Sequence, residues 1–278
     1  MAKKMPQTDF RAVRTVLEAS DFRHAPGNPQ RPVTDLVGKS TWEHIQTLPE
    51  TVSIYTSNDH GKDLSLLADL WGEWVRLIPT DGSVVQRAML VATDEFQAAT
   101  FNSLHGYYRI SAASLRAALE QMTIAADCEL RGDQVEQKSW LEGTGELLFG
   151  KASDNLQNRF RQTRLRFMFQ QDDGKNQAGW VRALHDALSN YAHARPGFDA
   201  LRMWEGSNGP IYVKSAFLWT AKMWLFTYTS CVILLKLMRP QTPKLNDVFA
   251  ERRITEIRQL VSVAKFLWPQ EHHTRTCQ

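Results

Sequence analysis

The apolar stretch SAFLWTAKMWLFTYTSCVILLKL, residues 215–237, constrains the fold more than any other segment. Its uninterrupted part, Met223 to Leu235, would form a helix only about 20 Å long, whereas a bilayer core needs about 20 mainly apolar residues. At about 100° per residue, Lys214, Lys222 and Lys236 fall within about 80° of one another and leave a narrow polar stripe. We therefore expect this segment to form the central helix of a helical bundle. The alternative is that it spans a membrane.

Further helices are predicted on either side of this segment. Residues 86–105 and 111–131 are typical of two long antiparallel helices. Ser111 or Ser114 is available to cap the second helix. The inward face of that helix is predicted to consist of Leu115, Leu119, Met122 and Ala126.

The first eighty residues give a less regular pattern. Residues 63–79 predict a helix with Asp63 as N-cap and Pro79 as its stop, because Leu67, Leu70, Trp71 and Trp74 recur at helical spacing. Residues 51–57, TVSIYTS, are rich in β-branched and aromatic side chains and indicate a short strand or extended segment. The fold class expected is therefore mainly α: a helical bundle over residues 81–278, with an N-terminal region, residues 1–80, of unknown role.

Composition excludes some classes of protein. With 43% hydrophobic residues, nine Trp and thirteen Phe, the chain has the composition of a globular protein with an aromatic core. The formal net charge of +3 is too small to indicate nucleic-acid binding over the whole surface, and it leaves room for a local basic patch. A mildly basic globular protein is expected.

The cysteines and the N-terminus predict a cytoplasmic protein. Cys128, Cys231 and Cys277 are odd in number and widely spaced, without the CxxC spacing of zinc or redox motifs. The start, MAKKMPQTDFRAV, lacks the apolar run of a secretory signal.

No cofactor or metal is predicted. The sequence has no P-loop, GxGxxG, HExxH or GxSxG motif, so nucleotide hydrolysis, hydride transfer, zinc proteolysis and α/β-hydrolase chemistry lack their usual signatures. The tail holds His272, His273 and Cys277, but structural zinc normally takes four ligands at better-defined spacing.

The stretch WVRALHDALSNYAHARPGF, residues 180–198, predicts an amphipathic helix that ends at Pro196 and Gly197. At about 100° per residue its polar side chains form one stripe, opposite Leu184 and Leu188. The stripe consists of Arg182, Asp186, Ser189 and His193, with His185 about 60° to one side. His193 would lie in the last turn, where the helix dipole favours a protonated imidazole.

Two interpretations of this stripe stay open. In the first, His193 is a general acid or base, and Ser189, Asn190 and Arg195 supply polar and cationic support for a phosphate, as metal-free RNA cleavage requires. In the second, the stripe is a solvated helix face with an Arg182–Asp186 pair and a histidine that stabilises the helix dipole.

A resemblance favours the first interpretation. GYYRISAASLRAALE, residues 106–120, followed by LHDALSNYAHARPG and a long apolar helix, resembles bacterial helical proteins of the HEPN class over about residues 86–239. The resemblance implies a commonly dimeric helical bundle and, in many members, a ribonuclease of antiphage defence or toxin–antitoxin systems. Its hallmark is an arginine, a polar residue and a histidine four to six positions after the arginine.

The hallmark residues are only partly present in this chain. His193 matches the hallmark histidine by its context in the sequence, and Asn190 could match a polar neighbour. Residues 186–189, where the hallmark arginine would stand, hold no arginine. The resemblance implies that Arg182, Arg195 or Arg116 would have to supply it.

A second candidate site is the run NRFRQTRLRFMFQ, residues 158–170. Arginines interleaved with aromatic residues suit RNA or single-stranded DNA, because guanidinium groups bind phosphates while rings stack on bases. The nucleic-acid-binding residues predicted are Arg159, Arg161, Arg164 and Arg166. The alternative is a solvated face over buried phenylalanines.

Two hypotheses of function follow. The first is a HEPN-like cytoplasmic ribonuclease that acts on RNA without metal, with His193, Asn190, Arg182 and Arg195 as its catalytic residues and a homodimer or protein partner. The second is a non-catalytic helical scaffold or sensor that binds a protein partner or nucleic acid. No membrane partner is expected under either.

Overall fold

The computed structural model describes residues 38–269 apart from residue 146, residues 171–178 and residues 194–209. The chain divides into two compact units, Met1–Glu43 and His44–Gln278. The short helix α3 (Lys39–Trp42) lies in the first unit, and the π-helical turn η1 (Glu43–Thr47) crosses the division. The second unit is a helical bundle, and no strand occurs among the residues described.

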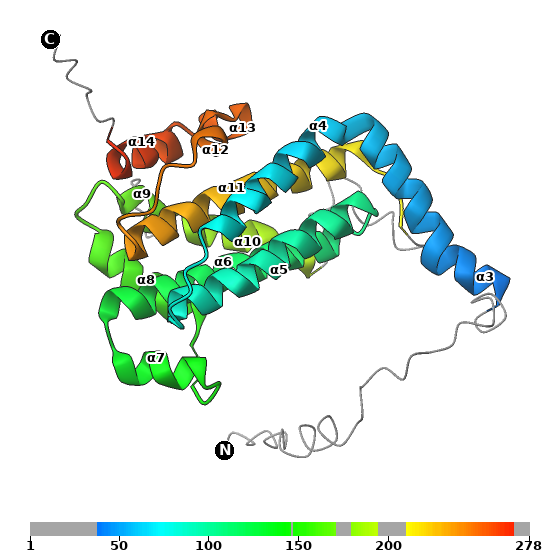
Figure 1. Cartoon of the computed structure of the whole chain (residues 1–278). Helices are drawn as coiled ribbons and strands as arrows, with labels where there is room; N and C mark the ends of the chain where they lie inside the picture. The colour runs from blue at the N-terminus through cyan, green and yellow to red at the C-terminus, as the bar shows by residue number, and fades with distance from the viewer. Residues whose placement is uncertain (1–37, 146, 171–178, 194–209, 270–278) are drawn as a thin grey trace, which may run out of the picture. The chain divides into compact units, whose positions relative to one another are not determined.

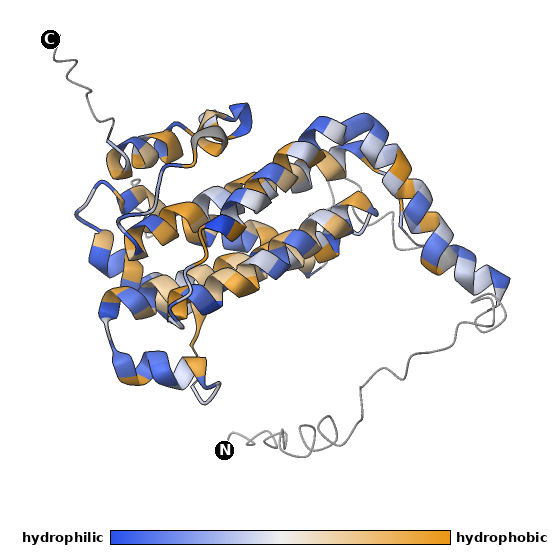
Figure 2. Cartoon of the chain, in the orientation of Figure 1, coloured by the Kyte–Doolittle hydropathy of each residue, from blue (hydrophilic) through white to orange (hydrophobic). Residues whose placement is uncertain are grey.

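The apolar segment forms α11 (Lys214–Met238), and α11 is the central helix of the bundle. It packs against α4, α5, α6 and α10, and its residues are buried almost throughout. Figure 2 colours the chain by hydropathy and shows apolar residues along the helices of the bundle. By length and composition it is the one described helix that could cross a bilayer, but 83% of its most apolar window is buried inside the bundle. The prediction of a core helix is thereby confirmed.

The two predicted antiparallel helices are α5 (Val84–Leu104) and α6 (Tyr108–Arg131), which lie side by side in Figure 1. The predicted inward face of α6 is confirmed, because its four apolar residues are all fully buried. The predicted serine cap is wrong: Tyr107 is the N-cap residue, and the Ser111 hydroxyl donates to the Ala99 carbonyl of α5 at 2.8 Å. The turn between them uses Gly106 at φ +84°, where a Cβ would meet the Ile211 carbonyl oxygen at 2.6 Å.

The third long helix, α4 (Leu48–Arg76), corrects two predictions. Residues 51–57 are helical rather than extended, and Asp63 lies inside the helix instead of capping it. The helix is kinked at His60, whose backbone angles are φ −131° and ψ 23°. Leu67, Leu70 and Trp74 are buried against α5 and α11, as their spacing predicted.

Shorter helices complete the bundle. They are α7 (Gln134–Leu141), α8 (Phe149–Phe160), α9 (Arg166–Phe169), α10 (Trp180–Ala192), α12 (Asn246–Ala250), α13 (Arg252–Thr255) and α14 (Arg258–Leu267). Of these, α8 and α10 pack on α6, and α14 packs on α9 and α11. The helix that carries the predicted histidine is thus packed on α6.

Candidate functional site

Helix α10 presents the predicted polar stripe at its junction with α6. Its buried residues are Val181, Leu184 and Leu188, which fix the rotation of the helix on the core. His193 is the C-cap residue, and its backbone N–H reaches the Ser189 and Tyr191 carbonyls. The helix therefore ends with an exposed histidine side chain next to α6.

Arg116 of α6 contacts that histidine directly. The distance from Arg116 Nη1 to His193 Nε2 is 2.6 Å, across 77 residues of sequence. A guanidinium group can only donate, so the imidazole Nε2 accepts and its proton stays on Nδ1. A neutral Nε2 is the form of histidine that accepts a proton.

Glu120 holds Arg116 in place from one turn further along α6. Its Oε1 lies 3.2 Å from Arg116 Nε and 2.8 Å from His185 Nε2 of α10. The hydrogen bond from His185 holds the pKa of Glu120 below its usual value against partial burial, and the charge of Arg116 acts in the same direction. Glu120 therefore stays ionised and joins both helices.

His185 is oriented by two further neighbours. Phe149, the first residue of α8, stacks on the imidazole with ring centroids 4.0 Å apart and an interplanar angle of 17°. Asp186 Oδ1 lies 3.4 Å from His185 Nδ1. The four side chains Arg116, Glu120, His185 and His193, here called the α6–α10 cluster, form one continuous polar network.

The other predicted catalytic residues lie at different places. Arg182 pairs with Asp154 of α8 at 2.9 Å rather than with Asp186, and donates to the Gly150 carbonyl at 3.2 Å. Asn190 is half-buried on α10. Arg195 lies outside the described residues, as do the histidines and the cysteine of the tail. Of the two arginines that the resemblance offered and the structure describes, Arg116 is the one beside His193.

The arginine run is not a strand. Residues 158–170 comprise the end of α8, a turn and α9. Arg159, Arg161 and Arg164 are exposed and Arg166 is half-buried, whereas the aromatic residues pack among themselves. Phe160 stacks on Phe169 with ring centroids 5.2 Å apart, and Phe167 stacks on Trp180 at 5.9 Å. The rings thus belong to the core, and nucleic-acid binding by the arginines stays a prediction.

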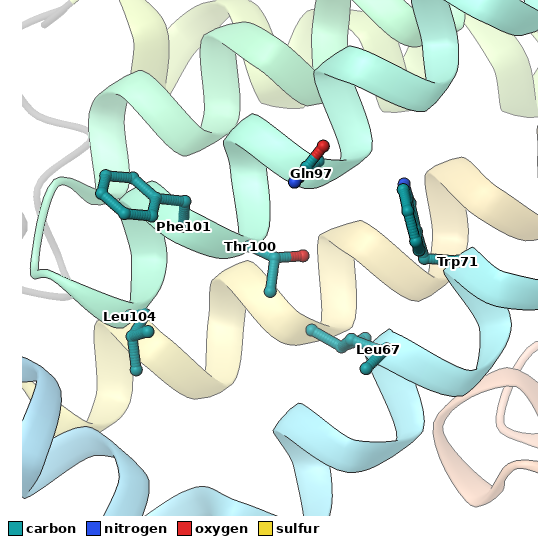
Figure 3. Close-up of a pocket in the computed structure, with 7 residues that line it drawn as sticks. Leu67, Trp71, Gln97, Thr100, Phe101 and Leu104 are labelled. Carbon is teal, nitrogen blue, oxygen red and sulfur yellow. The ribbon is translucent and has the colours of Figure 1, made fainter.

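An apolar pocket of about 260 Å³ lies between α4 and α5. Figure 3 shows its lining: Leu67, Trp71, Gln97, Thr100, Phe101 and Leu104. None of these side chains titrates, so the pocket offers apolar contact without acid–base chemistry. Within the described part of the chain, no group of three or more His, Cys, Asp or Glu side chains is placed to hold a metal ion.

Comparisons with known proteins give no relative: no family model, curated protein or solved structure matches this chain. The site must therefore be judged by its own geometry. Sequence reasoning found His193 and named Arg116 among three alternatives, but it missed Glu120 and Phe149. The spacing of Arg116 and Glu120, four residues apart on a helix, was the signal available for the ion pair.

Proposed function

We propose that this protein is a HEPN-like ribonuclease that cleaves RNA without metal, with His193 as general base and Arg116 as the cation at the phosphate. The observation that carries the proposal is the 2.6 Å contact between Arg116 and the neutral Nε2 of His193. A base and a permanent cation at one exposed point are the two groups that attack of a ribose 2′-hydroxyl on its own phosphate requires.

The proposed reaction uses the chain's own groups. An incoming phosphate attracts the Arg116 guanidinium, which binds phosphate oxygens in preference to a neutral ring. His193 Nε2 is then free to take the 2′-hydroxyl proton while the 2′-oxygen bonds to phosphorus. The bond from phosphorus to the 5′-oxygen breaks, and that oxygen takes a proton from water. The products are a 2′,3′-cyclic phosphate and a 5′-hydroxyl end.

Glu120 and His185 act as positioning residues in this proposal. Glu120 pairs with Arg116 on the Nε side of the guanidinium, so the phosphate competes with the His193 ring at Nη1 rather than with Glu120. His185, stacked on Phe149, fixes Glu120 in turn. The homodimer, the cytoplasmic location and the role in antiphage defence or a toxin–antitoxin pair stay predictions.

The test is incubation of the purified protein with a labelled RNA oligonucleotide in excess chelator, with fragment ends read by sequencing. His193→Ala and Arg116→Ala should each slow cleavage by about 10²- to 10⁴-fold. His193→Ala should keep its thermal unfolding midpoint within a few degrees, because an exposed helix-end histidine contributes only about 0.5 to 1 kcal/mol. Arg116→Ala should do the same, because its ion pair with Glu120 is partly exposed and contributes at most about 1 kcal/mol.

Arg182→Ala is the matched control. This substitution removes an arginine from α10, the helix that ends at His193, but leaves the Arg116–His193 contact in place. Full activity in Arg182→Ala and lost activity in Arg116→Ala would support the assignment, whereas full activity in His193→Ala would disprove it.

A second candidate function is the non-catalytic scaffold or sensor. The observation in its favour is that Arg116 is already engaged by Glu120 as well as by His193, an arrangement that also fastens α10 to α6. RNA left intact by the wild-type protein, with and without divalent metal, would favour this function.

A further inference from the structure

Helix α14 carries an open hollow on the face that it turns away from the core. Leu260, Val263 and Ala264 are buried on its inner side. The hollow on the other side has a volume of about 310 Å³. It is lined by Thr255, Arg258, Val261, Ser262 and Lys265. Four of these five side chains carry a cation or a hydroxyl group.

The polar lining residues share one stripe of the helix. Arg258, Ser262 and Lys265 are spaced i, i+4 and i+7, so they lie within about 60° of one another at about 100° per residue. All three are exposed. The stripe therefore offers five guanidinium N–H groups, an ammonium group and a hydroxyl to the same small volume.

Carboxylates are absent from this lining, and those nearest in sequence are engaged elsewhere. Glu256 is paired with Lys222 of α11 at 2.9 Å, and Glu251 is paired with Arg253 at 2.8 Å. Residues 257–269 contain no Asp or Glu at all. Two cations and a donor without a neighbouring carboxylate make a site for an anion rather than for a metal ion or a basic ligand.

The hollow is next to the arginine run of α8 and α9. The Arg164 guanidinium carbon lies 5.5 Å from the ring centroid of Phe266, the residue that follows Lys265. Phe266 is 43% exposed although it is a large apolar side chain. Residues 155–170 also contain no Asp or Glu, and Arg159, Arg161 and Arg164 are exposed. The basic surface thus continues from one segment to the other.

We propose that the α14 hollow is a phosphate-binding pocket for the backbone of single-stranded RNA. Arg258 and Lys265 hold one phosphodiester, and Ser262 donates a further hydrogen bond. Phe266, oriented by Arg164, stacks with the adjacent base, because aromatic and guanidinium groups together bind unpaired nucleotides. The inference rests on the proposed function for its ligand, but it places binding at a surface separate from the α6–α10 cluster.

The test uses a fluorescent 2′-O-methyl oligouridine, which lacks the attacking hydroxyl and therefore reports binding without cleavage. Affinity of the full chain is measured by anisotropy between about 50 and 200 mM salt. Arg258→Ala/Lys265→Ala should lower the slope of log affinity against log salt by about 0.7, since the two residues hold one phosphate and each phosphate contact on a single strand contributes about 0.7. Affinity at the lowest salt should fall at least about tenfold.

Lys62→Ala/Arg87→Ala is the matched control, because it removes the same charge from exposed positions on α4 and α5. Equal losses in the two double variants, or no binding by the wild-type protein, would overturn the inference. Failure of the proposed function is distinguishable from this result. If RNA is left uncut but its binding depends on Arg258 and Lys265, only the ribonuclease proposal is disproved. If RNA is cleaved but its binding does not depend on these two residues, only the phosphate-binding pocket is disproved.

Discussion

Two histidines in this protein have different partners and opposite surroundings. His60, at the kink of α4, is 5% exposed and stacks on Phe217 with ring centroids 4.4 Å apart. Its Nε2 donates to the Tyr212 hydroxyl at 3.1 Å, since that hydroxyl donates in turn to Asp59 at 2.6 Å. His193 is exposed at the end of α10 and touches a guanidinium.

The difference separates a buried histidine from one whose ring is exposed. A substrate cannot reach a ring that is packed against Phe217 and hydrogen-bonded to Tyr212, with Asp63 3.4 Å from Nδ1. Burial and the neighbouring carboxylate of Asp59 also raise the pKa of Tyr212, so that hydroxyl stays protonated as a donor. At His193, by contrast, the described residues place the side chain of Arg116 against an exposed ring.

The largest effect on stability is expected at His60. His60→Ala removes a buried ring and leaves a cavity beside Phe217, so we expect a loss of about 3 kcal/mol in the free energy of unfolding, measured in urea. His193→Ala should cost no more than about 1 kcal/mol. Equal losses at the two positions would mean that the difference in burial does not separate the two roles.

A smaller loss is expected at Asp63, which joins His60 to α13. Its carboxylate lies 2.8 Å from Arg253 and 3.4 Å from the His60 ring, and the pair is only partly buried. Asp63→Asn should lower the free energy of unfolding by about 1 kcal/mol in the same measurement. The matched control is Glu142→Gln, whose exposed partner Lys138 is 3.8 Å away and which should change stability by less than about 0.5 kcal/mol.

The sequence predicted the site of His193 better than that of His60, for a physical reason. Helical periodicity over residues 180–194 placed His193 at a helix end, because an amphipathic pattern is readable within one element. Around His60 the β-branched and aromatic content of residues 51–57 suggested extended structure. Tertiary burial overrode this propensity: Val52, Thr56 and His60, spaced four residues apart, are all buried on one side of α4.

The partner of His193 was beyond local reasoning. Arg116 is 77 residues away, and only the packing of α10 on α6 brings the two side chains together. The same holds for Phe266 and Arg164, which come from α14 and from the turn before α9. Periodicity gives the face that a helix buries, but the identity of the helix that covers it depends on contacts across the whole bundle.

The smallest effect expected is the pH-dependent contribution of Glu120 in the α6–α10 cluster. The pKa of Glu120 is lowered from 4.5 in the folded protein, so its pairing with His185 and Arg116 stabilises the fold at neutral pH. That stabilisation should disappear as the pH falls below about 4.5 and through the lower folded value. Because the groups are partly exposed, Glu120→Gln should cost at most about 1 kcal/mol near pH 7.

Urea unfolding of the wild type and Glu120→Gln over this pH range is the measurement, with Glu142→Gln as control. The two curves should converge in acid for Glu120→Gln, whereas the control should follow the wild type throughout. A difference that persists far below pH 4.5 would show that Glu120 contributes through packing rather than charge. Arg116 would then be held by shape alone, and the role of Glu120 in fixing the guanidinium for a phosphate would be lost.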